Sequence, residues 1–207
     1  MEIHVENVSY RFGEREVLTD FSADIEAGRV TALVGPSGSG KSTLLGGIAG
    51  YVKSASGRVT VSSGPRSPRE APRPEHIGWV PQGANALSGR TVLDNVAIGV
   101  LSRGITLREA TEIARAALDK VSLGDRAASL ARELSGGELQ RIAFARALAS
   151  GRPIILADEP TSSLDAANTE NIVELLYALR STATVVVATH DPALIAAAER
   201  CINLREA

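Results

Sequence analysis

The sequence contains a single cysteine, few aromatic residues and no long apolar run, and each shortage excludes a class of protein. Cys201 alone cannot form an internal disulfide, so the chain suits a reducing cytoplasm and must rely on a hydrophobic core. Aromatic residues make up only 3%, so Leu, Val, Ile and Ala must fill that core. No uncharged apolar stretch reaches the length of about 18 residues that suggests a membrane-spanning helix, and we expect no secretory signal.

Positive and negative charges nearly balance: the chain has 22 Lys and Arg residues and 24 Asp and Glu residues, for a net charge of −2. Such a chain has no overall basic field, so we expect no nucleic-acid partner. With 44% hydrophobic and 22% charged residues, the composition is that of a globular protein. We interpret residues 1–207 as a single domain.

Short apolar runs alternate with helical periodicity along most of the chain. Apolar runs at residues 30–34, 154–157 and 184–188 are typical of strands buried on both faces of a parallel sheet. Alternation in residues 2–12 and 17–26 instead predicts antiparallel strands. Helical spacing predicts helices over residues 41–49, 91–100, 107–121, 138–149 and 168–179. The expected fold class is α/β, with a mainly parallel sheet and an N-terminal antiparallel β subdomain.

Two segments interrupt this alternation. Residues 91–134 are mainly helical and lie between sheet segments, so we interpret them as an inserted helical subdomain. Residues 62–74 carry four prolines and three arginines, which predicts an exposed irregular loop.

A glycine-rich motif follows the apolar run 30–34 and precedes a predicted helix. It has the form G-x-x-x-x-G-K-[ST], and its strand–loop–helix context predicts a P-loop NTPase core. Its backbone N–H groups and the helix N-terminus favour an anion, Lys41 can reach the β and γ phosphates, and Ser42 can ligate Mg²⁺. The candidate ATP-binding residues here are Gly35, Pro36, Ser37, Gly38, Ser39, Gly40, Lys41, Ser42 and Thr43.

Polar residues follow two further apolar runs, where side chains of a parallel sheet could complete such a site. Asp158 directly follows the run 154–157 and can hold Mg²⁺ through a bound water. Glu159 is placed to polarise the water that attacks the γ-phosphate. His190 follows the run 184–188 and is a candidate contact of the γ-phosphate.

A second glycine-rich loop, Ser135, Gly136, Gly137 and Glu138 after Leu134, opens another helix. Together with the P-loop it resembles the signature loop of the ABC ATPases, and the resemblance covers essentially the whole chain. It implies that this loop contacts ATP bound to a second copy of the chain.

The resemblance assigns roles to further residues. Tyr10 matches the aromatic residue that stacks on adenine, and Gln82 matches the glutamine that contacts Mg²⁺ or the attacking water. Residues 162–165 match the loop that crosses the dimer interface, where Asp165 is a cross-subunit contact. Glu159 corresponds to the catalytic base and His190 to the histidine that senses the γ-phosphate, so the resemblance implies an active ATPase with ATP and Mg²⁺ as cofactors.

The direction of transport stays open between alternatives. Ala157 before residues 158–161, with residues 189–192, resembles the branch that serves lipoprotein release and efflux of macrolides, haem and antimicrobial peptides. Val80, Pro81 and Gln82 instead resemble importers of metals or siderophores. A soluble ABC ATPase without a membrane partner is the third alternative, although those proteins usually carry two nucleotide domains or a long coiled coil.

The resemblance therefore implies a subunit that dimerises around two ATP molecules and drives a separate transmembrane permease. Its expected location is cytoplasmic, peripheral on the inner face of the cell membrane, with membrane contact only through the permease.

Overall fold

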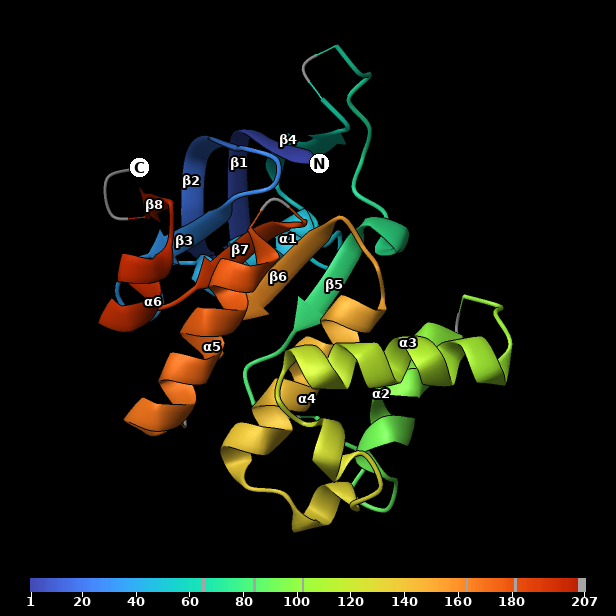
Figure 1. Ribbon diagram of the computed structural model, residues 1–207. Helices are drawn as coiled ribbons and strands as arrows, with labels where there is room; N and C mark the ends of the chain where they lie inside the picture. The colour runs from blue at the N-terminus through green and yellow to red at the C-terminus, as the bar shows by residue number, and fades with distance from the viewer. Residues whose placement is uncertain (65, 84, 102, 163, 181, 205–207) are drawn as a thin grey trace.

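The computed structural model describes residues 1–64, 66–83, 85–101, 103–162, 164–180 and 182–204. Its strands form two sheets, one antiparallel and one parallel (Figure 1). The strands, in chain order, are β1 (Glu2–Phe12), β2 (Arg15–Ile25), β3 (Val30–Val34), β4 (Ser56–Ser62), β5 (Ile77–Val80), β6 (Ile154–Asp158), β7 (Thr184–Ala188) and β8 (Arg200–Asn203). The antiparallel sheet has the order β2-β1-β4 and the parallel sheet the order β5-β6-β7-β3-β8.

The α-helices are α1 (Lys41–Ile48), α2 (Val92–Leu101), α3 (Leu107–Lys120), α4 (Gly136–Ala149), α5 (Ala166–Leu179) and α6 (Pro192–Ala197). Three helices, α1, α4 and α6, contact strands of the parallel sheet, whereas α2 and α3 contact each other and α4. Single 3₁₀ turns lie at Pro74–His76, Gly124–Arg126 and Ala131–Glu133. No helix among the described residues is long and apolar enough to cross a membrane.

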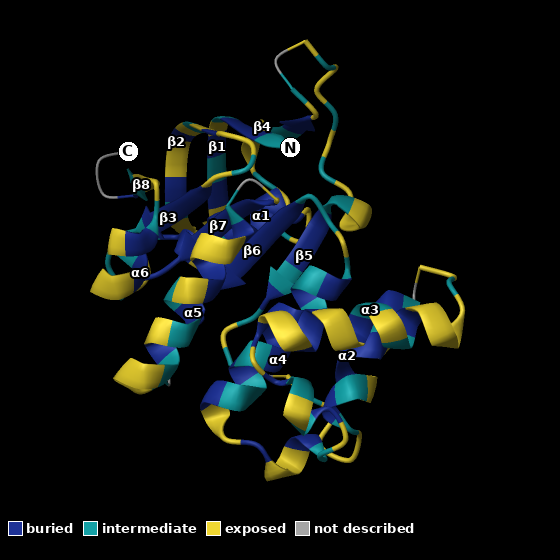
Figure 2. Cartoon of the chain, viewed as in Figure 1, coloured by how far each residue is buried: buried dark blue, intermediate teal, exposed yellow. Residues whose placement is uncertain are grey.

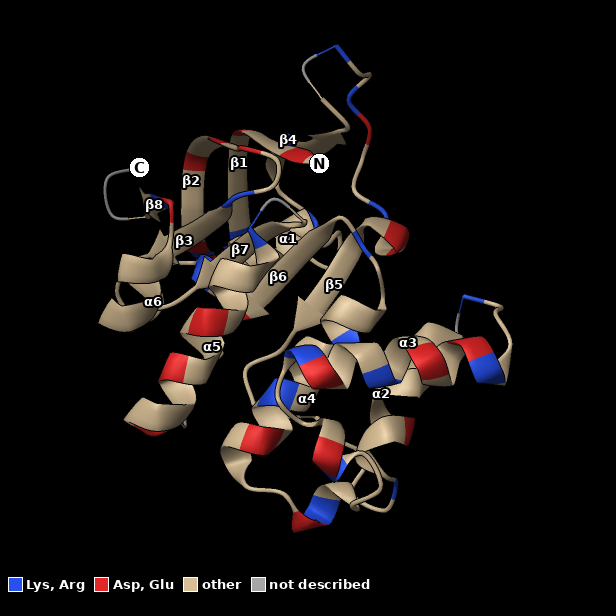
Figure 3. Cartoon of the chain, viewed as in Figure 1, with Lys and Arg blue, Asp and Glu red and all other residues tan. Residues whose placement is uncertain are grey.

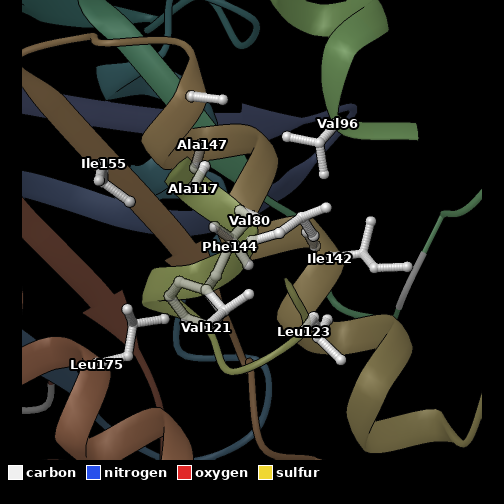
Figure 4. Close-up of a cluster of buried hydrophobic side chains, with 14 of the residues drawn as sticks. Val80, Val96, Ala117, Val121, Leu123, Ile142, Phe144, Ala147, Ile155 and Leu175 are labelled. Atoms are coloured by element: carbon white, nitrogen blue, oxygen red, sulfur yellow. The ribbon is translucent and has the colours of Figure 1, made fainter. Parts of the chain in front are cut away.

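The parallel sheet separates two hydrophobic clusters because successive side chains of a strand point to opposite faces. On β6, Ile155 packs with the first cluster and Leu156 with the second. The first cluster joins the sheet to α2, α3, α4 and α5 and is shown in Figure 4. The second joins the sheet to α1 and to the antiparallel strands. Both faces are covered, which explains why β3, β6 and β7 are buried almost throughout (Figure 2).

The helical segment carries its charges on the solvent side. The ribbon of α3 carries both acidic and basic positions (Figure 3), and all of its charged residues are exposed. Thr106 and Glu109 form a reciprocal cap at its first turn. Its buried residues, Ala110, Ala114, Ala117 and Leu118, follow helical spacing and pack toward α2 and α4. The described part of the 62–74 segment projects from the molecule as a loop, and its Pro65 lies outside the described residues (Figure 1).

Neither β4 nor α6 was predicted from the sequence. β4 has only Val59 and Val61 as alternating apolar residues, and its first two residues, Ser56 and Gly57, are typical of turns. α6 is a short helix whose start was readable, because Asp191 caps it through the backbone N–H of Ala193 and Pro192 occupies its first position.

Gly47 of α1 packs closely against the antiparallel sheet. A Cβ atom at Gly47 would lie 1.7 Å from the hydroxyl oxygen of Tyr10, whose side chain is buried. We therefore predict that Gly47→Ala lowers the free energy of unfolding by about 1–3 kcal/mol, because the new methyl group overlaps Tyr10. This loss outweighs the better helix propensity of alanine. Urea denaturation measures the difference.

Gly99→Ala in α2 is the matched control, because a Cβ atom there meets nothing within 4 Å. This exchange is expected to leave stability unchanged or to raise it by up to about 1 kcal/mol. A Gly47→Ala protein as stable as the wild type would contradict the close packing of Tyr10 on α1.

Candidate nucleotide-binding site

The glycine-rich loop lies between β3 and α1, and its backbone is shaped by glycine. Gly40 caps α1 in a left-handed conformation, with φ of 95°, which side chains other than glycine rarely adopt. A Cβ atom there would also lie 3.3 Å from the carbonyl oxygen of Val17. The loop thus presents the positive N-terminal end of α1, a preformed position for an anion such as phosphate.

A cleft of about 600 Å³ opens above this loop. It brings together most of the predicted residues from four separate parts of the chain: the phosphate loop, the segment after β5, the end of β6 and the segment after β7. The β1–β2 hairpin forms another wall. The lining residues are Phe12, Arg15, Val17, Gly35, Pro36, Ser37, Gly38, Gly40, Lys41, Ser42, Thr43, Gln82, Glu159 and His190.

Lys41 is almost fully buried, and its ammonium group is turned back on its own loop. Its Nζ atom donates to the carbonyl oxygens of Gly35 and Pro36 at 2.9 and 3.2 Å and lies 3.5 Å from Oε1 of Glu159. The hydroxyl of Ser39, in the same loop, is buried without a hydrogen-bond partner among the described residues. The phosphate loop thus contains a buried hydroxyl that has no partner in the described part of the chain, at Ser39, and a buried ammonium group, at Lys41. Both are expected to hydrogen-bond to a phosphate group when one is bound.

Asp158 lies at the end of β6, directly beside the phosphate loop. Its Oδ1 atom accepts a hydrogen bond of 2.9 Å from the hydroxyl of Ser42. Burial raises the pKa of the Asp158 carboxyl, and the charge of Glu159 adds to this, while the Ser42 hydrogen bond and Lys41 oppose it. The hydroxyl oxygen of Ser42 and Oδ1 of Asp158 are adjacent hard ligands of the kind that Mg²⁺ prefers.

Glu159 and His190 meet at the ends of neighbouring strands. Nδ1 of His190 lies 2.9 Å from Oε2 of Glu159. Glu159 has a φ of 42°, unusual for a residue other than glycine, and its backbone N–H donates to the carbonyl oxygen of Ala188. A strained backbone held by a neighbouring strand fixes the direction of the carboxylate. Glu159 is mostly buried, whereas the side chain of His190 is exposed to the cleft.

Gln82 follows β5 and is exposed at the edge of the same cleft. The structure thus collects Lys41, Ser42, Gln82, Glu159 and His190 in one place, although they come from four separate segments of the sequence.

The second glycine-rich loop does not line this cleft. Ser135 caps α4 by accepting from the backbone N–H of Glu138, whose carboxylate accepts in turn from the backbone N–H of Ser135 at 2.8 Å. Gly136 is open, while Gly137 packs closely against the side chain of Asn168.

Asp165 lies apart from the cleft as well. It caps α5 by accepting from the backbone N–H of Asn168 at 2.9 Å. Ser163, in the segment that was compared with the dimer-crossing loop, lies outside the described residues.

The position predicted for Tyr10 is wrong. Tyr10 is 1% exposed, packs against Gly47 beneath the antiparallel sheet and has a pKa raised by burial, so it cannot stack on a base in the cleft. Phe12, two residues further along β1, is 55% exposed and lines the cleft. It is the aromatic ring available to a nucleotide base.

A phosphate loop at the start of a helix, with carboxylates at the ends of neighbouring parallel strands, defines the class of P-loop nucleotide-binding proteins. The family described as ABC transporter matches residues 18–162 of this chain. The chain belongs to the ABC transporter family and is one of its ATP-binding, ATP-hydrolysing cassettes.

Several relatives resemble the chain over nearly its whole length. The lipoprotein-releasing system ATP-binding protein LolD of Bacteroides fragilis is 39% identical, with 98% of this chain and 97% of LolD covered. The macrolide export ATP-binding/permease protein MacB of Escherichia coli is 38% identical over 96% of this chain, which spans 32% of MacB. The dimeric ATP-binding cassette MJ0796, solved in a post-hydrolysis state with ADP and Pi, is 33% identical with a TM-score of 0.83, covering 97% of this chain and 93% of that cassette.

The raised pKa of Asp158 predicts a pH-dependent cost of folding. Between the pKa of the unfolded chain, about 3.9, and the higher folded value, the folded state binds more protons, so stability falls as pH rises. Asp158→Asn keeps an acceptor for Ser42 and removes this charge. We expect the variant to melt above the wild type at neutral pH, without nucleotide or metal, and the difference to shrink as pH falls below the folded pKa.

The measurement is thermal unfolding followed by circular dichroism across a pH series. Asp125→Asn, an exposed position near α3, controls for the loss of one negative charge. An Asp158→Asn protein that melts below the wild type at neutral pH would show that the carboxylate stabilises the fold.

Proposed function

We propose that this chain is the nucleotide-binding subunit of an ABC transporter of the export type, acting on a separate transmembrane permease. The observation that carries the ATPase part is the meeting of Lys41, Ser42 and Glu159 in one cleft, because cation, metal ligand and carboxylate are the parts that phosphoryl transfer to water requires. The likeness to LolD and MacB supports the export type.

The arrangement assigns a part to each side chain when ATP is bound. Lys41 exchanges the carbonyl oxygens of its own loop for phosphate oxygens, and the α1 N-terminus stabilises the same charge. Ser42 and Asp158, with Gln82 at the cleft edge, are the residues that would hold Mg²⁺, which neutralises charge on the phosphates. Glu159 orients water toward the γ-phosphate, and His190 contacts that phosphate from the end of β7.

The second glycine-rich loop supports a dimer. It has the features of an anion-binding helix N-terminus, yet it lies outside the cleft of its own chain. A second copy placed head to tail brings Ser135, Gly136, Gly137 and Glu138 to the bound ATP, with Asp165 at the interface. The dimeric state of MJ0796 agrees with this assembly.

The permease is proposed as the second partner. MacB combines an ATP-binding part with a permease in one chain, whereas this chain matches only about a third of it. The helical segment 91–134 and Gln82 are the elements that would pass closure of the dimer to the permease. This assembly places the chain on the cytoplasmic face of the membrane.

Removal of the Glu159 carboxylate tests the hydrolytic role. We predict that Glu159→Gln retains ATP binding but loses turnover by roughly 10²–10⁴-fold, because the amide cannot accept a proton from the attacking water. Phosphate release measures turnover, and size-exclusion chromatography with ATP is expected to show a dimer of the variant.

Glu174→Gln, at an exposed position of α5, is the control for the same chemical change. Lys41→Ala should instead weaken ATP binding itself, which separates the two steps. Turnover at the wild-type rate in Glu159→Gln would mean that another group activates water.

Purification of the tagged chain from detergent-solubilised membranes of its own host tests the transport role. We expect a permease with few membrane spans and a large extracytoplasmic domain to co-purify and to be identified by mass spectrometry. A permease with many spans and a solute-binding protein would establish an importer instead. Recovery in the soluble fraction alone would contradict both and favour the soluble class of ABC ATPases.

A further inference from the structure

The tip of the β1–β2 hairpin presents two side chains to the nucleotide cleft. Phe12 and Arg15 are directly paired across the two antiparallel strands, on either side of a short turn. Paired residues of this kind place their side chains on the same face of a sheet. Both line the cleft, and the phosphate loop forms the opposite wall.

Arg15 reaches toward the phosphate loop itself. Its Nη2 atom lies 3.6 Å from the position that a Cβ atom on Gly38 would occupy. Gly38 has a φ of 80°, so the loop turns there without a side chain between its backbone and the guanidinium. The cation is therefore held next to the backbone that surrounds the anion position.

The charge of Arg15 is not used inside the chain. Within the described ranges, no hydrogen bond or ion pair joins the Arg15 side chain to another residue. The acidic side chain that lines the cleft, Glu159, already contacts Lys41 with one oxygen and His190 with the other. Glu16, the acid that follows Arg15 in the sequence, is paired across the hairpin with Arg11. Arg15 is thus a cation of the cleft that is left for a ligand.

We propose that Arg15 is a specificity residue that binds the phosphate chain of the nucleotide from the hairpin side, opposite Lys41. The planar guanidinium matches phosphate oxygens in a bidentate way, which an ammonium group cannot do. The hairpin then recognises both ends of the ligand, with Phe12 under the base and Arg15 on the phosphates. This assignment rests on the proposed function, because it takes a nucleoside polyphosphate as the ligand.

Affinities for ATP, ADP and adenosine test the proposal. They are measured by competition with a fluorescent ATP analogue in a Glu159→Gln background, so that ATP is not consumed. We expect Arg15→Ala to bind ATP and ADP about tenfold more weakly and adenosine as well as before. Arg15→Lys should recover only part of the loss, because it restores the charge without the planar fork.

Arg11→Ala is the matched control, since it removes the same charge from the same hairpin at a position outside the cleft. It is expected to leave all three affinities unchanged. Circular dichroism melts verify that the variants are folded; Arg15 is exposed, so we expect little change.

Two results would overturn the proposal. Equal losses for ATP, ADP and adenosine would place Arg15 on the base, and unchanged affinities in Arg15→Ala would show that it does not touch the nucleotide. A failure of the proposed function would give a different result. The Glu159→Gln protein with Arg15 intact would then bind none of the three ligands, and adding Lys41→Ala would not change this.

Discussion

The nucleotide cleft depends on how one buried ammonium group is neutralised. Lys41 is 7% exposed and cannot keep its charge there without partners, because an unpaired buried charge costs several kcal/mol. Its partners are two carbonyl oxygens of the phosphate loop and the carboxylate of Glu159. Glu159 is joined in turn to His190. One cation therefore ties the start of α1 to the ends of β6 and β7.

The two-sheet architecture holds that cation in place. Leu44, Leu45 and Ile48 of α1 are buried between the antiparallel strands and the parallel sheet. A helix enclosed on both sides cannot rotate, so its first residue stays at the same height as the strand ends. The absence of a side chain at Gly47 allows Tyr10 to close this packing. The antiparallel sheet thus positions the site as well as supplying Phe12 and Arg15 to it.

Much of this was predictable because buried parallel strands have a simple pattern. Uninterrupted apolar runs identified β3, β6 and β7, and their carboxyl ends carry the phosphate loop, the two carboxylates and His190. Strand ends of a parallel sheet share one edge, so sequence spacing alone predicted that these residues meet. In the structure, the reciprocal caps of Thr106 with Glu109 and of Ser135 with Glu138 fix the starts of α3 and α4 locally.

The sequence does not show which aromatic ring faces the nucleotide cleft, and the reason is physical. Tyr10 was the ring predicted to contact the base, whereas Phe12 lies two residues further along the same strand, and the register of β1 against β2 is irregular between Tyr10 and Arg11. Which ring reaches the cleft depends on where α1 ends beneath the sheet, and that is a tertiary property. β4 was missed for a related reason, because its pairing with β1 outweighs the turn-like composition of its first residues.

The charge pairs of the cleft also explain how binding prepares hydrolysis. Without ligand, both oxygens of Glu159 are engaged, one by Lys41 and one by His190. A carboxylate held in this way is poorly placed to accept a proton from water. A polyphosphate carries more charge than a single carboxylate and attracts Lys41 more strongly. In the proposed function its arrival therefore releases the oxygen of Glu159 that faces Lys41, and Glu159 is the carboxylate to which we assign the polarisation of the attacking water.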